Sequence, residues 1–182
     1  MPAPLEGSCV AAFVEVLRLC GVQRGDACAV LSETQSRAVL VDCARMALHQ
    51  LGATVFEVRV PTPPVTTPVP MCSTGASLAL TGQGPVVGAL ARCTLVVDAT
   101  VEGLQHAAEL PAILAGGARV LVVSNEHPQI LQRCVPRAED EAVVREAMRR
   151  LKAARRMRVS SRAGTDLAID LAGARIGGVW GF

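Results

Sequence analysis

The chain has 182 residues, of which 51% are hydrophobic and 19% are charged, and its formal net charge is +2. This length and apolar content suit one substantial hydrophobic core, and the nearly balanced charge provides no field that would attract nucleic acid. No apolar stretch reaches the roughly 18 residues that a membrane span needs, and the first residues lack the pattern of a signal peptide. We therefore expect a cytoplasmic globular protein that binds neither nucleic acid nor a membrane.

Seven cysteines are scattered along the chain, and no two of them form a Cys-x-x-Cys pair. An odd number at such spacings predicts neither a disulfide framework nor a thiolate zinc site. We expect most of them to be small buried hydrophobes, with Cys72, in a polar loop, the most exposed.

The first 60 residues alternate between helical and strand-like patterns. Apolar residues recur at helical spacing over 9–21 and 36–52, and these stretches close at Gly21 and Gly52, a common helix end. The short apolar runs at 27–33 and 54–60 predict strands.

Prolines and glycines dominate residues 61–84, which predicts a surface loop because proline fixes φ and lacks a backbone donor. A loop of this length is often a lid or a binding segment, and an irregular excursion packed against a neighbouring element is an equal alternative.

The alternation then resumes. The patterns predict helices over 85–93, 108–117, 127–135 and 138–156, strands over 94–100 and 118–126, and a β-hairpin over 156–176 with its turn at Ala163 and Gly164. Short apolar strands bracketed by helices predict an α/β fold, a doubly wound and mostly parallel sheet with helices on both faces. We assign residues 1–155 to this Rossmann-like domain and residues 156–182 to the hairpin and the start of a second, β-rich region.

Open parallel sheets bind ligands beyond the carboxyl ends of their strands. The polar clusters at those predicted ends are Ser32 to Thr34, Arg59, Asp98 to His106, and Ser124 to His127. Helix-capping residues also gather at such places, so a structural role is the alternative. The turn after the first strand, "VLSETQSR", has no glycine, which argues against a nucleotide pyrophosphate site.

Of the three histidines, His106 is the strongest candidate, because it lies in the loop after a strand and near Glu102 and Glu109. Its alternative role is to cap the helix that follows. His127 precedes a proline at a predicted helix start, where it could cap the helix or contact a ligand, and His49 is expected at a helix surface.

The remaining candidates for substrate binding lie at or just after the carboxyl end of a predicted strand: Glu102, Ser124, Asn125 and His127. A metal site would need several histidines or carboxylates at short spacings, and the sequence has no His-x-x-x-His or His-x-Asp pair. We therefore expect no metal site within this chain.

Two stretches, "LVVDATVEGLQHAAELPAILAGGARVLVVSNEHPQIL" and "RVSSRAGTDLAIDLAGARIGGVWGF", resemble the amino-terminal half of the 2,5-dihydroxypyridine 5,6-dioxygenase family and its relatives labelled aminopeptidase T-type leucyl aminopeptidases. The most specific parts are the loop ending at His106 and the S-x-A-G-T-D-L hairpin. In this family an α/β domain precedes a larger β-rich domain whose histidines and carboxylates bind the metal. The resemblance thus implies that 156–182 begin that second domain, and that Fe(II) or another divalent metal belongs to the complete enzyme.

For function, the resemblance implies that the complete enzyme cleaves the ring of a hydroxylated N-heterocycle, a small-molecule substrate. His106 would contact the substrate or exchange protons with it, which suits a side chain whose ordinary pKa is near neutral. A glutamate of the family falls at the apolar Val179, which argues for a different substrate. The isolated 182-residue chain is expected to be inactive.

Two alternatives remain open at this point. One is a metal-dependent aminopeptidase, which the resemblance also covers. The other is a non-catalytic domain for oligomerisation or for covering another chain's active site, because a tail bearing Trp180 and Phe182 would favour association. We expect a homo-oligomer or association with a metal-bearing domain.

Overall fold

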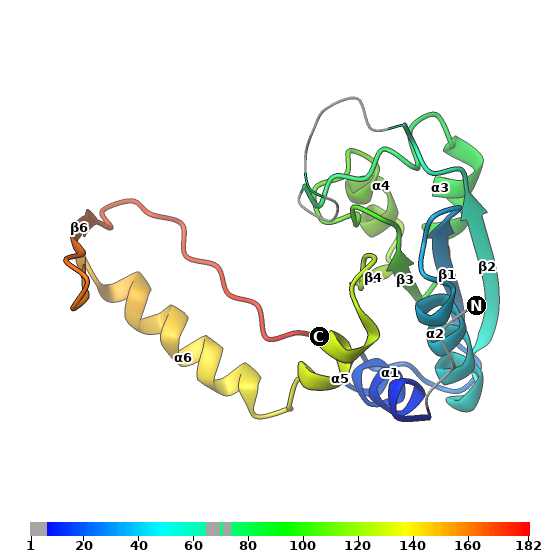
Figure 1. Ribbon diagram of the computed structural model, residues 1–182, viewed down its shortest axis with the longest axis horizontal. Coiled ribbons are helices and arrows are strands. Elements are labelled where there is room, and N and C mark those ends of the chain that lie inside the picture. The colour runs from blue at the N-terminus through cyan, green and yellow to red at the C-terminus, as the bar shows by residue number, and fades with distance from the viewer. Residues whose placement is uncertain (1–6, 65–69, 71–73) are drawn as a thin grey trace. The chain divides into compact units, whose positions relative to one another are not determined.

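The computed structural model describes residues 7–64, 70 and 74–182, and the chain forms two compact units, Met1–Val135 and Pro136–Phe182. The first unit alternates helices and strands as predicted (Figure 1). Its elements are α1 (Gly7–Leu19), β1 (Ala27–Glu33), α2 (Ala38–Gln50), β2 (Thr54–Val60), α3 (Gly84–Leu90), β3 (Leu95–Ala99), α4 (Leu110–Ala115), β4 (Arg119–Val122) and α5 (Pro128–Arg133). The described residues between β2 and α3 form neither helix nor strand, which confirms the predicted loop.

The four strands form one sheet in the order β2-β1-β3-β4, and every neighbouring pair is parallel. In the register, Leu31 of β1 lies opposite Asp98 of β3, and Asp98 lies opposite Val122 of β4. The α/β fold is therefore confirmed, with β1 and β3 at the centre of the sheet.

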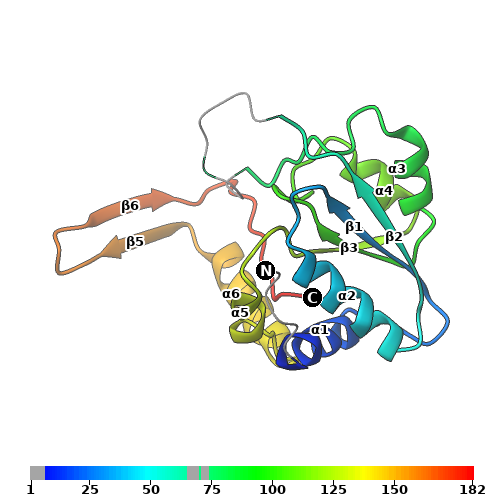
Figure 2. The same cartoon turned by 45° about the vertical axis from the view of Figure 1, so that its right-hand side comes forward.

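Side chains that alternate along the central strands face two separate cores. On one face, Val30 and Val97 pack with α1 and α2, through residues such as Phe13. On the other face, Leu31 and Val96 pack with α3 and α4. Figure 2 shows the sheet between these two helix pairs. Burial on both faces explains why the central strands read as continuous apolar runs.

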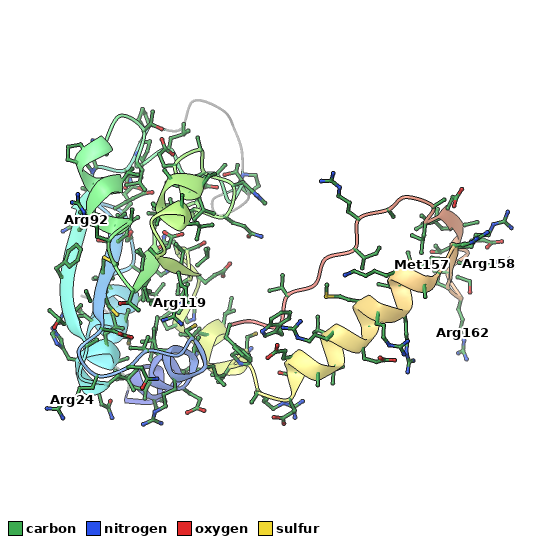
Figure 3. The ribbon with its side chains drawn as sticks, turned by 180° about the vertical axis from the view of Figure 1, so that it is seen from behind. Arg24, Arg92, Arg119, Met157, Arg158 and Arg162 are labelled. Carbon is green, nitrogen blue, oxygen red and sulfur yellow. The ribbon has the colours of Figure 1, made fainter. Side chains whose placement is uncertain are left out.

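The strand β4 is shorter than the predicted strand over 118–126. The N–H groups of Val123 and Ser124 both donate to the Asp98 carbonyl oxygen, at 2.9 and 3.0 Å, and Ser124 has a φ of 55°. This left-handed residue turns the chain away from the sheet before the polar residues that follow. At the other end of β4, the Arg119 guanidinium donates to the Cys20 carbonyl after α1 (Figure 3).

Four of the six described cysteines are buried as predicted, and Cys20 is half-buried. Buried ones are Cys9, Cys28, Cys43 and Cys93, and all six described cysteines are free thiols. Burial raises the pKa of the Cys28 thiol to about 11, so this group stays protonated near neutrality. Cys134, directly after α5, is exposed, and Cys72 lies outside the described residues.

The second unit consists of α6 (Asp140–Ala153) and an antiparallel hairpin of β5 (Arg156–Ser160) and β6 (Asp166–Asp170). The hairpin turn contains Gly164 with a φ of 98°, as predicted, and Arg158 Nε lies 2.9 Å from Asp166 Oδ1 across the strands. Figure 3 labels Arg158 on this hairpin. A left-handed residue at this turn favours glycine because it lacks a Cβ.

Within this unit the chain end packs against α6. A Cβ at Gly178 would lie only 2.7 Å from Met148 Sδ, and the Arg145 guanidinium lies 4.7 Å from the centre of the Trp180 ring. The helix α6 and the hairpin belong to the same compact unit, Pro136–Phe182, whereas the sequence pattern groups α6 with the sheet. Among the described residues of both units, no helix combines the length and apolar composition that a bilayer crossing demands.

Candidate functional site

The chain segments that follow β1 and β3 lead to opposite edges of the sheet. The chain passes from β1 through α2 to β2 on one side, and from β3 through α4 to β4 on the other. The carboxyl ends of β1 and β3 therefore meet at a topological switch point, the place where open parallel sheets leave room for ligands. Glu33 ends β1 and Asp98 lies one residue before the end of β3.

Asp98 is fully buried and forms the inner support of the loop after β3. Its Oδ1 accepts hydrogen bonds from Thr100 N at 3.0 Å and Thr100 Oγ1 at 2.6 Å, and its Oδ2 accepts from Leu104 N at 2.6 Å. The loop over 100–104 therefore wraps around a single carboxylate.

The same environment raises the proton affinity of Asp98. Burial raises its pKa from 3.8 to about 6, the hydrogen bonds from Thr100 and Leu104 oppose this rise, and the negative charge of Glu33 adds to it. A carboxyl group that titrates near neutrality at a strand end is a feature common at functional sites.

Glu33 is the second buried acid of this edge, with 2% of its surface exposed. Its Oε1 accepts a hydrogen bond from Ser77 Oγ at 2.9 Å, and its Oε2 has no hydrogen-bond partner among the described residues. The Ser36 hydroxyl accepts from Glu33 N at 2.7 Å and donates to the Ala99 carbonyl at 2.7 Å, which joins the ends of β1 and β3.

Residues 74–77 lie along the loop that contains His106. Ser77 N donates to Gly103 O at 2.9 Å, and His106 N donates to Gly75 O at 2.6 Å. The Glu102 carboxylate accepts from Thr74 N at 3.1 Å and from Thr74 Oγ1 at 2.7 Å. Glu102, a predicted substrate contact, thus binds the neighbouring segment.

His106 is exposed in this loop. Its ring lies beside Gly75, where an added Cβ would be 3.2 Å from His106 Cδ2. Glu109 occupies the N-cap position of α4, so His106 does not have the predicted alternative role of N-cap residue. A substrate contact through its ring remains a prediction.

The predicted residues after β4 take different positions. Ser124 is half-buried next to the His106 loop, and a Cβ at Gly103 would lie 2.4 Å from its Oγ. Asn125 is buried and turned toward α2: its Oδ1 accepts from Arg37 N at 2.7 Å, and its carbonyl accepts from Arg37 Nε at 3.0 Å.

His127 is exposed and is the N-cap residue of α5, where its Nδ1 accepts from Gln129 N at 3.3 Å. The capping role suggested by the sequence is therefore present. Of the predicted site residues, the structure brings Ser124 together with the loop of Glu102 and His106, and it gives Asn125 and His127 contacts that support helices.

Sequence reasoning placed Glu33 and Asp98 in the polar clusters at the strand ends without giving either a role, and it left Ser77 out. An acidic residue inside the apolar run "LVVDA" is a signal for a buried carboxylate, and "ACAVLSE" ends in the other one. Ser77 offers no such signal, because its partner lies 44 residues earlier in the chain.

No three His, Cys, Asp or Glu side chains converge to hold a metal ion within residues 7–64, 70 and 74–182. The carboxylate oxygens of Asp98 already accept three hydrogen bonds from the loop.

The amino-acid sequence of the chain is similar to that of known proteins. The family model described as 2,5-dihydroxypyridine 5,6-dioxygenase matches residues 8–182. The chain belongs to this family. A 2,5-dihydroxypyridine 5,6-dioxygenase of Pseudomonas putida strain KT2440 is 35% identical over 161 residues, which are 87% of this chain and 45% of that protein.

The fold agrees with that of a solved dioxygenase. The structure of the 2,5-dihydroxypyridine dioxygenase from Pseudomonas putida KT2440 matches with a TM-score of 0.79 and 32% identity, over 92% of this chain and 48% of that chain. The chain thus spans about half the length of the dioxygenases that it matches. The resemblance inferred from the His106 loop and the hairpin is confirmed at the level of the family.

Proposed function

We propose that this chain is the α/β part of a dioxygenase that cleaves the ring of a hydroxylated N-heterocycle. The observation that carries this proposal is the match to the Pseudomonas putida enzyme, at 35% identity over 87% of the chain and a TM-score of 0.79. Identity at this level over a shared fold supports the reaction type more strongly than it supports the substrate.

We propose that the metal-binding residues belong to the portion of these relatives that the chain does not match, and that the metal is Fe(II) or another divalent ion, as the resemblance implies. Support comes from the extent of the match, which covers 45% of the Pseudomonas putida enzyme and leaves the rest of that protein for the metal ligands. The chain alone would then be inactive, because dioxygen does not react readily with an aromatic ring without a redox-active group.

The role of this chain would be to bind and orient the ring at the switch point. His106 is exposed on a loop that is held from both sides, so its imidazole could accept or donate a proton at a ring hydroxyl. Glu102 and Ser124 would shape this side of the site. We propose that Asn125 and His127 act indirectly, by holding the starts of α2 and α5.

The proposal can be tested with a chimera in which this chain replaces the matched segment of the Pseudomonas putida enzyme. We expect the purified chimera, supplied with Fe(II), to consume oxygen and 2,5-dihydroxypyridine or a related hydroxypyridine. The 182-residue chain under the same conditions should show no turnover. A folded, iron-loaded chimera that is inactive on every hydroxypyridine would contradict the proposed reaction, and turnover by the chain alone would contradict the proposed location of the metal ligands.

We also propose that the second unit associates with a metal-bearing domain or with another copy of the chain. None of residues 136–182, all of which the structure describes, is buried, and a two-stranded hairpin alone is marginally stable in water. Light scattering during gel filtration distinguishes a monomer from an oligomer. The aminopeptidase alternative rests on the initial resemblance and stays a prediction.

A further inference from the structure

Hydrogen bonds hold the His106 loop, residues 100–106, on two sides. The residue that holds it on the inner side belongs to the sheet, and the residues on the outer side do not. On the inner side, Asp98 belongs to β3 and binds Thr100 and Leu104 directly. On the outer side, residues 74–77 bind the loop through Ser77 N and Gly75 O. These residues belong to no helix or strand, so the outer support needs its own attachment to the sheet.

Ser77 provides that attachment. Its hydroxyl donates to Glu33 Oε1 at 2.9 Å and accepts from Ala79 N at 3.1 Å, while its own N–H donates to Gly103 O at 2.9 Å. Ser77 and Glu33 are each 2% exposed. Water is excluded from this hydrogen bond, and a bond to a carboxylate in such surroundings is stronger than one between neutral groups.

The acidic side chain of Glu33 at this buried position calls for a structural explanation. Glu33 Oε2 is buried without a hydrogen-bond partner among the described residues, an arrangement that costs stability. Its neighbour Ser36 already joins the ends of β1 and β3 through a hydroxyl, so the acid is not needed for that link. What Glu33 adds is the bond to Ser77.

We propose that Glu33, through Ser77, is a positioning residue that sets the place of the His106 loop at the switch point. The path runs from Glu33 Oε1 to Ser77, from Ser77 N to Gly103 O, and along residues 74–77 to the bond between Gly75 O and His106 N. The proposed positioning depends only on these hydrogen bonds. Its consequence for turnover rests on the function proposed above for His106.

The first test uses native-state hydrogen exchange of the full chain, with the His106 and Ser77 amides as reporters and amides of β1 and β3 as references. We expect Ser77→Ala and Glu33→Ala each to speed exchange of the His106 amide by about tenfold or more relative to the references, as loss of a bond to a charged group would. Glu33→Gln keeps an acceptor oxygen for Ser77 and should restore most of the protection. Ser160→Ala, at an exposed serine of β5, is the matched control and should change neither reporter.

The double variant makes the test specific. If Glu33 acts through Ser77, the combined Glu33→Ala and Ser77→Ala change should speed His106 exchange no more than either single change. Equal acceleration of reporters and references would show general destabilisation and overturn the proposal. An unchanged His106 amide in Ser77→Ala, or additive effects in the double variant, would overturn it as well.

The consequence for turnover is measured in the active chimera. We expect Ser77→Ala to lower kcat by about tenfold with a smaller change in KM, because a misplaced proton-transfer group affects the chemical step more than binding. Normal kcat despite fast His106 exchange would reject the function of His106 and leave the positioning intact. A folded, iron-loaded parent chimera that is inactive on every hydroxypyridine would contradict the proposed function without bearing on the exchange result.

Discussion

Glu33 and Asp98 are buried acids at the ends of neighbouring parallel strands, and the negative charge of Glu33 contributes to the raised pKa of Asp98. Each carboxylate also supports one side of the same loop, Asp98 through Thr100 and Leu104, and Glu33 through Ser77. The electrostatics of this pair and the position of the His106 loop are thus linked through the same two side chains.

The raised pKa of Asp98 predicts a pH dependence of stability. Its folded pKa of about 6 lies above its ordinary value of 3.8, so the folded chain binds this proton more tightly than the unfolded chain. Stability should therefore fall as pH rises from about 4 to about 6 and should level off above that, by roughly 3 kcal/mol from this group. Urea unfolding between pH 4 and 7 measures the effect, with Asp98→Asn as the variant that cannot titrate. Parallel curves for both proteins would contradict the prediction.

Glu33→Gln should lower the pKa of Asp98, because it removes the negative charge that helps to raise it. The change should be smaller than the shift caused by burial, which is the main reason for the raised value. The carboxyl carbon of Asp98, followed by NMR during a pH titration, reports this directly. Replacing the exposed Glu126 with Gln is a control at the same sheet edge that should leave the midpoint in place.

Local patterns were sufficient for most of the fold. The apolar runs of β1 and β3 reflect burial on both faces, and the hairpin turn at Gly164 needs a left-handed residue. The short β4 was not predictable, because it ends where two N–H groups bind the Asp98 carbonyl of another strand. The grouping of α6 with the hairpin likewise depends on tertiary contacts.

The candidate site was predictable only in outline. Strand-end reasoning pointed to the loop of Glu102 and His106 and to Ser124, which the structure brings together. It could not foresee that Asn125 would face α2, since this depends on how α2 packs against the strand end. It also could not find the bond between Glu33 and Ser77, which joins residues far apart in the sequence.

Substitution of Gly103 tests how closely the His106 loop lies against Ser124. Its φ is 80°, and a Cβ there would lie 2.4 Å from Ser124 Oγ. Gly103→Ala should therefore lose stability through both backbone strain and a clash, by about 2–4 kcal/mol. Gly82 has a φ of 75° with open space around it, so Gly82→Ala should show only the strain, about 1 kcal/mol. Equal losses in urea unfolding would mean that Ser124 moves away freely.

Asn125 is expected to matter for stability rather than for binding. Asn125→Ala removes the oxygen that accepts from Arg37 N at the start of α2, which should lower the free energy of unfolding by about 1–3 kcal/mol. Asn125→Asp keeps an acceptor oxygen and should lose less. Thermal and urea unfolding of the two variants measure the difference, and an Asn125→Ala protein as stable as the parent would contradict this supporting role.

His106 is expected to matter for turnover rather than for stability. Because its side chain is exposed and does not cap α4, His106→Ala should change stability by less than about 0.5 kcal/mol. In the active chimera, loss of a proton-transfer group should lower kcat by roughly 10²-fold or more. His49→Ala, at an exposed histidine of α2, is the matched control and should leave kcat and stability unchanged. If kcat of His106→Ala stays within about twofold of the parent, the histidine takes no part in proton transfer, and the loop would contribute through its backbone and Glu102 alone.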